Sequence, residues 1–241
     1  MSYTIDGYIS DRPVAANALP AERVGFIRRT YAHLAVAILA FAGIEAILIS
    51  TGVAEQFVRT IFSGGNAGLL ILMVAFIGGG YLAQYWAHAA TSRAMQYAGL
   101  ALYVLLEVVI FLPILYVADT YFAHQYVIAK AGLLTLGLFA GLSMAVFVTG
   151  QDFSFMRTGL IVASWLSVGL VVVAILFGLN LGTWFSFAMV GLAAAFIIYD
   201  TSNILHHYRT DQHVGAALQL FASVALMFYY ILRIFMSDRR G

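Results

Sequence analysis

The sequence predicts an all-α, polytopic membrane protein: a bundle of seven transmembrane helices with the last helix at its centre. Composition is the first observation, because 63% of the 241 residues are hydrophobic and only 10% are charged. A soluble domain carries roughly 25% charged residues, so this chain cannot cover itself with a polar surface and needs the lipid bilayer as its solvent. The second observation is that the apolar residues gather into seven runs, each near the length that crosses a bilayer.

Each run is an expected helix of about twenty mainly apolar residues. Gly64-Gly65-Asn66 breaks the chain before the second run, and Gly178-Leu179-Asn180 separates the fifth from the sixth. The seventh run is less apolar, which favours a position inside the bundle, shielded from lipid; a re-entrant segment is the alternative. The expected spans are 31–50, 67–87, 97–117, 127–149, 158–178, 183–199 and 214–235.

Glycines in two spans predict close helix packing. Gly137 and Gly141 form a GxxxG pair in the fourth span, and Gly78-Gly79-Gly80 lies within the second. Small residues let helix backbones approach each other in a membrane, so we expect both motifs to pack inside the bundle.

Basic residues predict the orientation. Residues 1–25 form a polar N-terminal segment, and residues 26–241 form the membrane domain. We expect the N-terminus in the cytoplasm and the C-terminus outside, with the segment 1–25 as a recognition tail or a disordered terminus. The expected cytoplasmic side carries Arg12, Arg23, Arg28, Arg29, Arg93, Arg157 and Arg209, and the other side carries Arg59, Lys130, Arg233, Arg239 and Arg240.

Several function classes are disfavoured. The chain has no cysteine, so it forms neither disulfides nor thiolate metal sites, and its net charge of +1 gives no reason to expect nucleic-acid binding. It contains no G-x-S-x-G or H-E-x-x-H motif, and no residue is assigned a catalytic role. His206, His207 and His213 lie in the sixth loop, where we expect a solvated, partly titrating cluster rather than a metal site. We therefore expect no enzyme activity, cofactor or bound metal.

Five stretches occur in the order and spacing of a known family. They are Arg28-Arg29-Thr30-Tyr31, Leu112-Pro113-Ile114-Leu115, the segment from Ala131 to Met156, Phe196 to Thr201, and Leu218 to Phe235. Together they resemble the Bax inhibitor-1 family, also called the YccA-like or transmembrane BAX inhibitor motif family. The resemblance implies a seven-helix bundle around a central last helix. It also implies a pH-sensitive calcium leak, suppression of cell death in eukaryotes, or, in bacteria, regulation of the inner-membrane protease FtsH.

The calcium leak of this family depends on two aspartates that close the pore together and on an arginine that tunes them. Asp200 matches the first aspartate, Ser223 falls at the second, and His88 falls near the arginine. A lone carboxylate cannot form a proton-sharing pair. Two hypotheses follow: a calcium or proton leak gated near Asp200, or a non-conducting regulatory protein that binds a membrane protease such as FtsH or another membrane complex.

Asp200 itself has two interpretations. It ends the sixth apolar run, so it either caps a helix boundary or acts as a gate facing the cytoplasm. His88 is expected on the same side, where its imidazolium would pair with Asp200 and make a switch near neutral pH; a solvated loop position is the alternative.

Charged residues also fall within the expected spans. Glu107 lies near the middle of the third span, at a depth where no basic residue is available, so we expect it to face the bundle interior, protonated or in a water-filled cavity. Glu45 and Lys130 lie at similar depths near the external face, where an ion pair or two snorkelling side chains are expected. Asp152, in the pattern Asp152-Phe153-Ser154, is expected to cap the start of the fifth span.

Overall fold

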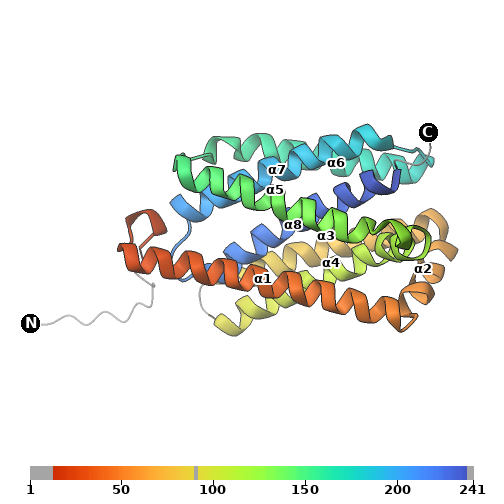
Figure 1. Ribbon diagram of the computed structural model, residues 1–241, viewed down its shortest axis with the longest axis horizontal. Helices are drawn as coiled ribbons and strands as arrows, with labels where there is room; N and C mark the ends of the chain where they lie inside the picture. Colours follow the sequence, from red (N-terminus) through yellow and green to blue (C-terminus); the bar gives the residue numbers. More distant parts are fainter. Residues whose placement is uncertain (1–12, 90–91, 238–241) are drawn as a thin grey trace, which may run out of the picture.

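The computed structural model describes residues 13–89 and 92–237, and this part of the chain folds as a bundle of long helices (Figure 1). Seven of the helices are long and apolar enough to cross a membrane, which confirms the predicted all-α, polytopic fold. They are α1 (Pro20–Ser50), α3 (Gly65–Ala87), α4 (Arg93–Phe122), α5 (Val127–Thr149), α6 (Arg157–Phe177), α7 (Gly182–His206) and α8 (His213–Ser237). A shorter helix, α2 (Val53–Ser63), joins α1 to α3 at one end of the bundle.

The last helix, α8, lies at the centre. Of its most apolar stretch 72% is buried, against at most 44% for any other spanning helix, and it contacts α1, α3, α4, α5 and α7. This confirms the central position predicted from its polar residues. Those residues are stable there because neighbouring helices, rather than lipid, surround them.

Three helices extend beyond the expected spans. Helix α1 begins at Pro20, since a proline at the first helical position has a backbone already suited to a helix. Helix α4 begins at Arg93, where the Ser92 hydroxyl caps it by accepting from the amide of Met95. Helix α7 continues to His206 instead of ending at 199. Apolar runs mark only the part of a helix in the hydrocarbon core, so they underestimate helices that project into water.

The segment before α1 packs onto the loop between α7 and α8. The amide of Ala15 donates to the carbonyl of Tyr208 at 2.8 Å, and the amide of Thr210 donates to the carbonyl of Pro13 at 3.3 Å. Ala15 is fully buried. The expected boundary at residue 25 lies within α1, and residues 1–12 lie outside the described part of the chain.

Glycine packing was predicted correctly for only one of the two motifs. A methyl group on Gly79 would lie 2.9 Å from the Leu106 side chain, so this glycine does allow α3 and α4 to approach. The prediction for the GxxxG pair is wrong, because Gly137 and Gly141 are exposed and a methyl group there would meet nothing within 4 Å. Helices α3 and α4 also approach closely at Gly99, where a methyl group would lie 2.5 Å from the Ala83 carbonyl oxygen.

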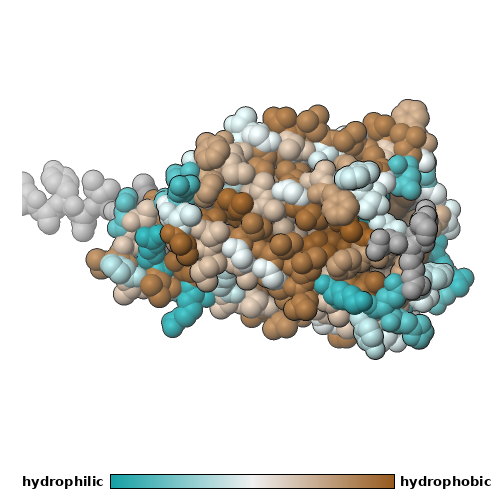
Figure 2. Space-filling view, turned by 45° about the horizontal axis from the view of Figure 1, so that its top comes forward, coloured by the Kyte–Doolittle hydropathy of each residue, from teal (hydrophilic) through white to brown (hydrophobic). Residues whose placement is uncertain are grey.

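The molecular surface has the distribution that a bilayer requires. Figure 2 shows hydrophobic residues over the middle of the bundle and hydrophilic residues gathered toward its two ends. Large apolar side chains, including Val36, Leu133, Val148 and Trp165, are exposed along the spans. In water these would be a large unfavourable surface, whereas in lipid they are solvated. The protein is therefore an integral membrane protein.

Candidate functional site

Asp200 lies inside α7, about two turns before the helix ends at His206. Its interpretation as a helix boundary is wrong. Only 3% of the residue is exposed, and the Ser223 hydroxyl on α8 donates to its Oδ2 at 2.5 Å. A buried carboxyl group is costly unless it is hydrogen-bonded, so Ser223 stabilises Asp200 at the interface between α7 and the central helix.

Three consecutive polar residues of α7 bind three different neighbours. Asp200 binds Ser223 on α8, while Thr201 shares a 3.3 Å hydrogen bond with Ser143 on α5. The next residue, Ser202, accepts from the amide of Phe153 at 2.8 Å in the loop between α5 and α6. Successive helical residues point about 100° apart, so one short stretch reaches all three elements. Asp200 is thus held in a polar layer that fixes α7 against its surroundings.

A cavity of about 390 Å³ opens beside this layer. Its walls come from α3, α4, α7 and α8, and Phe76, Phe111 and Phe196 are among its apolar lining residues. The residues with polar side-chain groups that line it are Gln84, Tyr103, Glu107, Asp200, Gln219, Ser223, Tyr229 and Tyr230. The cavity therefore brings together Asp200, Ser223 and Glu107, three of the candidate site residues.

Glu107 faces the bundle interior, as its depth predicted. It is 5% exposed, and the Tyr103 side chain, one turn earlier on α4, interacts with its carboxyl group. No arginine, lysine or histidine is among the residues that line this cavity. The two carboxyl groups of the cavity are instead hydrogen-bonded to hydroxyl groups, Asp200 to Ser223 and Glu107 to Tyr103. The cavity therefore presents acidic and neutral polar groups to any ion that enters.

His88 does not pair with Asp200, so that prediction is wrong. The histidine follows the last residue of α3, where its Nδ1 contacts the Gln84 carbonyl at 2.8 Å and its Nε2 lies 3.1 Å from the Tyr208 hydroxyl. Tyr208, in the α7–α8 loop, is nearly buried, and this burial raises the pKa of its hydroxyl group. His88 and Tyr208 together connect the end of α3 to the loop that precedes the central helix.

The predicted ion pair between Glu45 and Lys130 is also absent from the described residues. Lys130 is exposed, which fits the snorkelling alternative. Glu45 is 3% exposed, and neither carboxyl oxygen has a hydrogen-bond partner. The residue lines a second cavity, of about 620 Å³, toward the opposite end of the bundle. Equal depth did not produce a pair because the two side chains face different directions around their helices.

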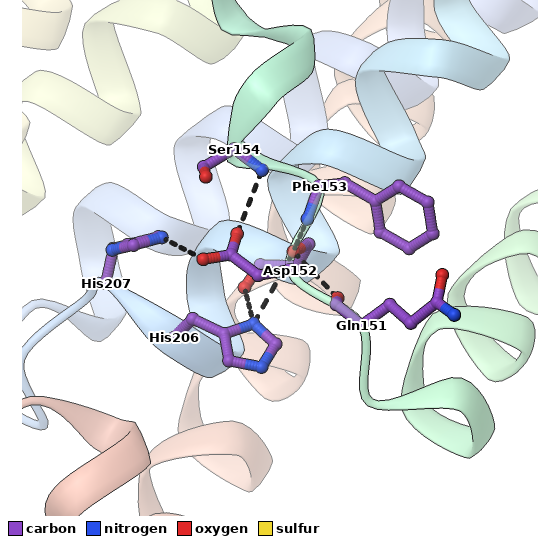
Figure 3. Close-up of polar contacts among 7 residues, drawn as sticks. Gln151, Asp152, Phe153, Ser154, His206 and His207 are labelled. Atoms are coloured by element: carbon purple, nitrogen blue, oxygen red, sulfur yellow. Dashed lines mark hydrogen bonds and ion pairs between the residues drawn. The ribbon is translucent and has the colours of Figure 1, made fainter.

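Figure 3 shows how the α5–α6 loop is attached to the end of α7. The Asp152 carboxylate accepts from the amide of Ser154 at 2.9 Å in the turn that leads into α6. Its predicted role as the cap of that helix is wrong, because the N-cap of α6 is Met156 and no side chain caps it. The other carboxylate oxygen of Asp152 lies 3.0 Å from Nε2 of His207. The amide of Ser154 is the main reason that the pKa of Asp152 is lowered, with a smaller contribution from His207.

The loop histidines have separate roles. His206 contacts the carbonyl of Ser202 in its own helix at 2.9 Å, while His207 binds Asp152. The expectation of a solvated loop position is wrong for His213, which lies buried at the start of α8 with its ring 5.0 Å from that of His33. No group of three or more potential metal ligands occurs among residues 13–89 and 92–237.

Sequence reasoning did not assign roles to several polar residues of the site. Tyr103 and Glu107 are spaced four apart, which places both on one face of a helix and is the signal that was available. The sequence carried no such signal for Gln84, Gln219 or Ser202. Gln84 and Gln219 line the cavity, and Ser202 binds the amide of Phe153, which is distant from it in the sequence.

Comparison with known proteins agrees with this architecture. Residues 23–240 match the family described as "Inhibitor of apoptosis-promoting Bax1". The chain is 25% identical to Protein LIFEGUARD 3 of Arabidopsis thaliana, over 97% of this chain and 94% of that protein. It is 27% identical to an uncharacterized protein of Pseudomonas aeruginosa, over 92% and 93% of the two chains. It is also 31% identical to Bax inhibitor 1 of Schizosaccharomyces pombe, over 48% and 44%. This chain, with its buried Asp200 beside a central last helix, belongs to the Bax inhibitor-1 family.

Proposed function

We propose that this protein provides a pH-sensitive leak for calcium or protons, with Asp200 as its gating residue. The observation that carries the proposal is the cavity beside the central helix, onto which the carboxyl groups of both Asp200 and Glu107 open. Ionisable residues inside a membrane bundle are energetically costly, and they commonly mark ion or proton pathways. Calcium prefers oxygen ligands, and the polar lining of this cavity includes carboxyl, hydroxyl and amide groups.

Ser223 changes how such a leak responds to pH. A serine hydroxyl donates a hydrogen bond to Asp200 but does not titrate in the physiological range, so the two residues cannot share a proton as two carboxyl groups do. Glu107 is the second titrating group on the cavity. We therefore assign pH sensitivity to Asp200 and Glu107 together, and Ser223 to the stabilisation of the closed form.

Contacts join the end of α3, the α7–α8 loop and the segment before α1 at the end of the bundle nearest Asp200. His88 contacts Tyr208, and the backbone of Tyr208 accepts from Ala15 in the segment before α1. Opening a path from the cavity to this end requires that these contacts separate. In the orientation indicated by the arginines this end faces the cytoplasm of a bacterial cell, with the C-terminus outside the inner membrane.

Reconstitution in liposomes tests the proposal. Calcium and proton flux are measured between pH 6 and 8 for the wild type, Asp200→Asn and Glu107→Gln. Glu22→Gln is the matched control, because Glu22 is exposed at the start of α1 and does not line the cavity. We expect pH-dependent flux in the wild type and the control, and a changed pH profile in both cavity variants. Flux no greater than that of empty liposomes at every pH would exclude a leak.

A second candidate function is regulation of a membrane protease or another membrane complex without ion conduction. The observation that favours it is the serine at position 223, which donates a hydrogen bond to Asp200 but cannot share a proton with it as a second carboxyl group would. Affinity capture from native membranes tests this function with the full chain and with a variant that lacks residues 1–12. This deletion keeps Ala15 and its contact with Tyr208 intact. A protease complex captured by both forms would support regulation and exclude recognition by residues 1–12, whereas capture by neither form would contradict the regulatory function.

A further inference from the structure

An apolar groove runs between α1 and α4, and none of the residues that line it also lines the cavity at Asp200. It has a volume of about 600 Å³, within the range of small-molecule sites. Along α1 it extends from Ala32 to Ile44, about 18 Å at helical rise, which is a little more than half of the 30 Å hydrocarbon core. Its length therefore matches the acyl region of one leaflet. The groove is lined by Ala32, Val36, Ala40, Ile44, Ala101 and Leu105, together with deeper residues of both helices.

Polar groups lie only at one end of this lining. His33 and Tyr97 are its polar residues, and Nε2 of His33 lies 3.1 Å from the Tyr97 hydroxyl. Arg29 and Arg93 each precede one of these residues by four positions, so each lies one turn nearer the water on the same helix face. Helices α1 and α4 both begin at this end of the bundle, so the two arginines approach the membrane surface together.

His213 adds a third, independent feature to this end. Its ring lies 5.0 Å from that of His33, it is 3% exposed, and its Nδ1 has no hydrogen-bond partner. Arg29, Arg93 and His33 all act on it electrostatically, and Asp211 is the acidic group that opposes them. Asp211 is itself engaged by Arg209 at 3.3 Å, so the balance of charge at this end of the groove is positive.

We propose that this groove binds an anionic phospholipid of the surrounding leaflet. One acyl chain lies along α1 and α4, and the phosphate is bound among Arg29, Arg93, His33 and Tyr97. The proposal depends on the length of the apolar groove and on the placement of cations at headgroup depth. Basic residues beside transmembrane helices attract anionic lipids, and each arginine contributes about a fivefold gain in affinity. This site is separate from the proposed leak pathway, and its test does not depend on flux.

Native mass spectrometry of the purified full-length protein tests the proposal, with titration of either phosphatidylglycerol or phosphatidylcholine of equal chain length. We expect tighter binding of phosphatidylglycerol, and a loss of about 25-fold in its affinity for the double variant Arg29→Gln/Arg93→Gln. Arg157→Gln is the matched control, because Arg157 is exposed at the start of α6, outside the groove. It should leave the affinity within about twofold.

A second variant tests the apolar part of the site. Ala40 is exposed on the groove wall, so Ala40→Phe fills the groove without entering the bundle core, and it should weaken the binding of both lipids. Inorganic phosphate at millimolar concentration should not displace phosphatidylglycerol. Equal affinity for the two lipids would overturn the proposal, as would an equal loss in Arg157→Gln. Unchanged binding in Ala40→Phe would exclude the groove, and competition by inorganic phosphate would indicate a simple anion site.

Discussion

Replacing Ser223 by alanine removes the hydroxyl group that donates to Asp200 at 2.5 Å. Both residues are at most 5% exposed, so water does not readily replace the lost donor. Leaving a buried polar group unsatisfied costs about 1–3 kcal/mol, and a hydrogen bond to a charged group contributes about 1.5–3 kcal/mol. Side-chain hydrogen bonds between membrane helices average only about 0.6 kcal/mol, because polar groups find other partners in the unfolded state. The burial of Asp200 places Ser223→Ala in the upper range, at a loss of about 1.5–3 kcal/mol.

Equilibrium unfolding in mixed micelles, with increasing mole fraction of a denaturing detergent, measures this loss. Ser167→Ala is the matched control, since the Ser167 hydroxyl donates only to the Ala163 carbonyl in its own helix. It should change the free energy of unfolding by less than about 0.5 kcal/mol. A double-mutant cycle with Asp200→Asn then isolates the pair, and we expect a coupling energy above about 1 kcal/mol. If Ser223→Ala matches the control, or if the cycle shows no coupling, the reasoning about the Asp200 site is refuted.

The remaining predictions concern the contacts of the α5–α6 loop with α7 and the packing of α4 against α3. Ser202→Ala removes the acceptor of the Phe153 amide, so hydrogen exchange at residues 150–156 should increase while exchange in the spans stays unchanged. The pKa of Asp152 is lowered in the folded protein, so ionised Asp152 stabilises the fold above the ordinary aspartate pKa of about 4. This stabilisation is lost as the pH falls further, and Asp152→Asn should remove this acid dependence of the free energy of unfolding. Gly99→Ala should destabilise the protein by about 1–3 kcal/mol, because the new methyl group would lie 2.5 Å from α3, whereas Gly137→Ala, which meets nothing, should not; equal thermal unfolding temperatures would contradict this packing.

The elements of the fold could be predicted because hydropathy is a local property of the chain. Each run of about twenty apolar residues required a crossing helix, and the greater polarity of the last run required protein around it rather than lipid. The ends of the helices could be predicted less accurately from the sequence. The extension of α7 to His206 depends on polar residues whose partners lie on α8, α5 and the α5–α6 loop.

Contacts between side chains of different spanning helices were harder to predict than the depth of a residue within the membrane. Depth follows from counting residues along a helix, and it correctly indicated that Glu107 faces the interior. It also suggested the Glu45–Lys130 and His88–Asp200 pairs, neither of which forms. A pair requires that both side chains point toward each other around their helix axes, and that direction is set by the packing of the whole bundle.

The sequence by itself determined that the chain dissolves in a bilayer, crosses it seven times, surrounds its last helix with the others and carries an intramembrane carboxyl group at Glu107. These properties follow from the transfer of individual residues between water and lipid, which depends on composition and order alone. Only the tertiary structure decided that Asp200 is buried against Ser223 rather than at a helix end, and that it shares a cavity with Glu107. Those facts depend on the rotation of each helix about its axis, which is fixed by the simultaneous packing of neighbours distant in the sequence.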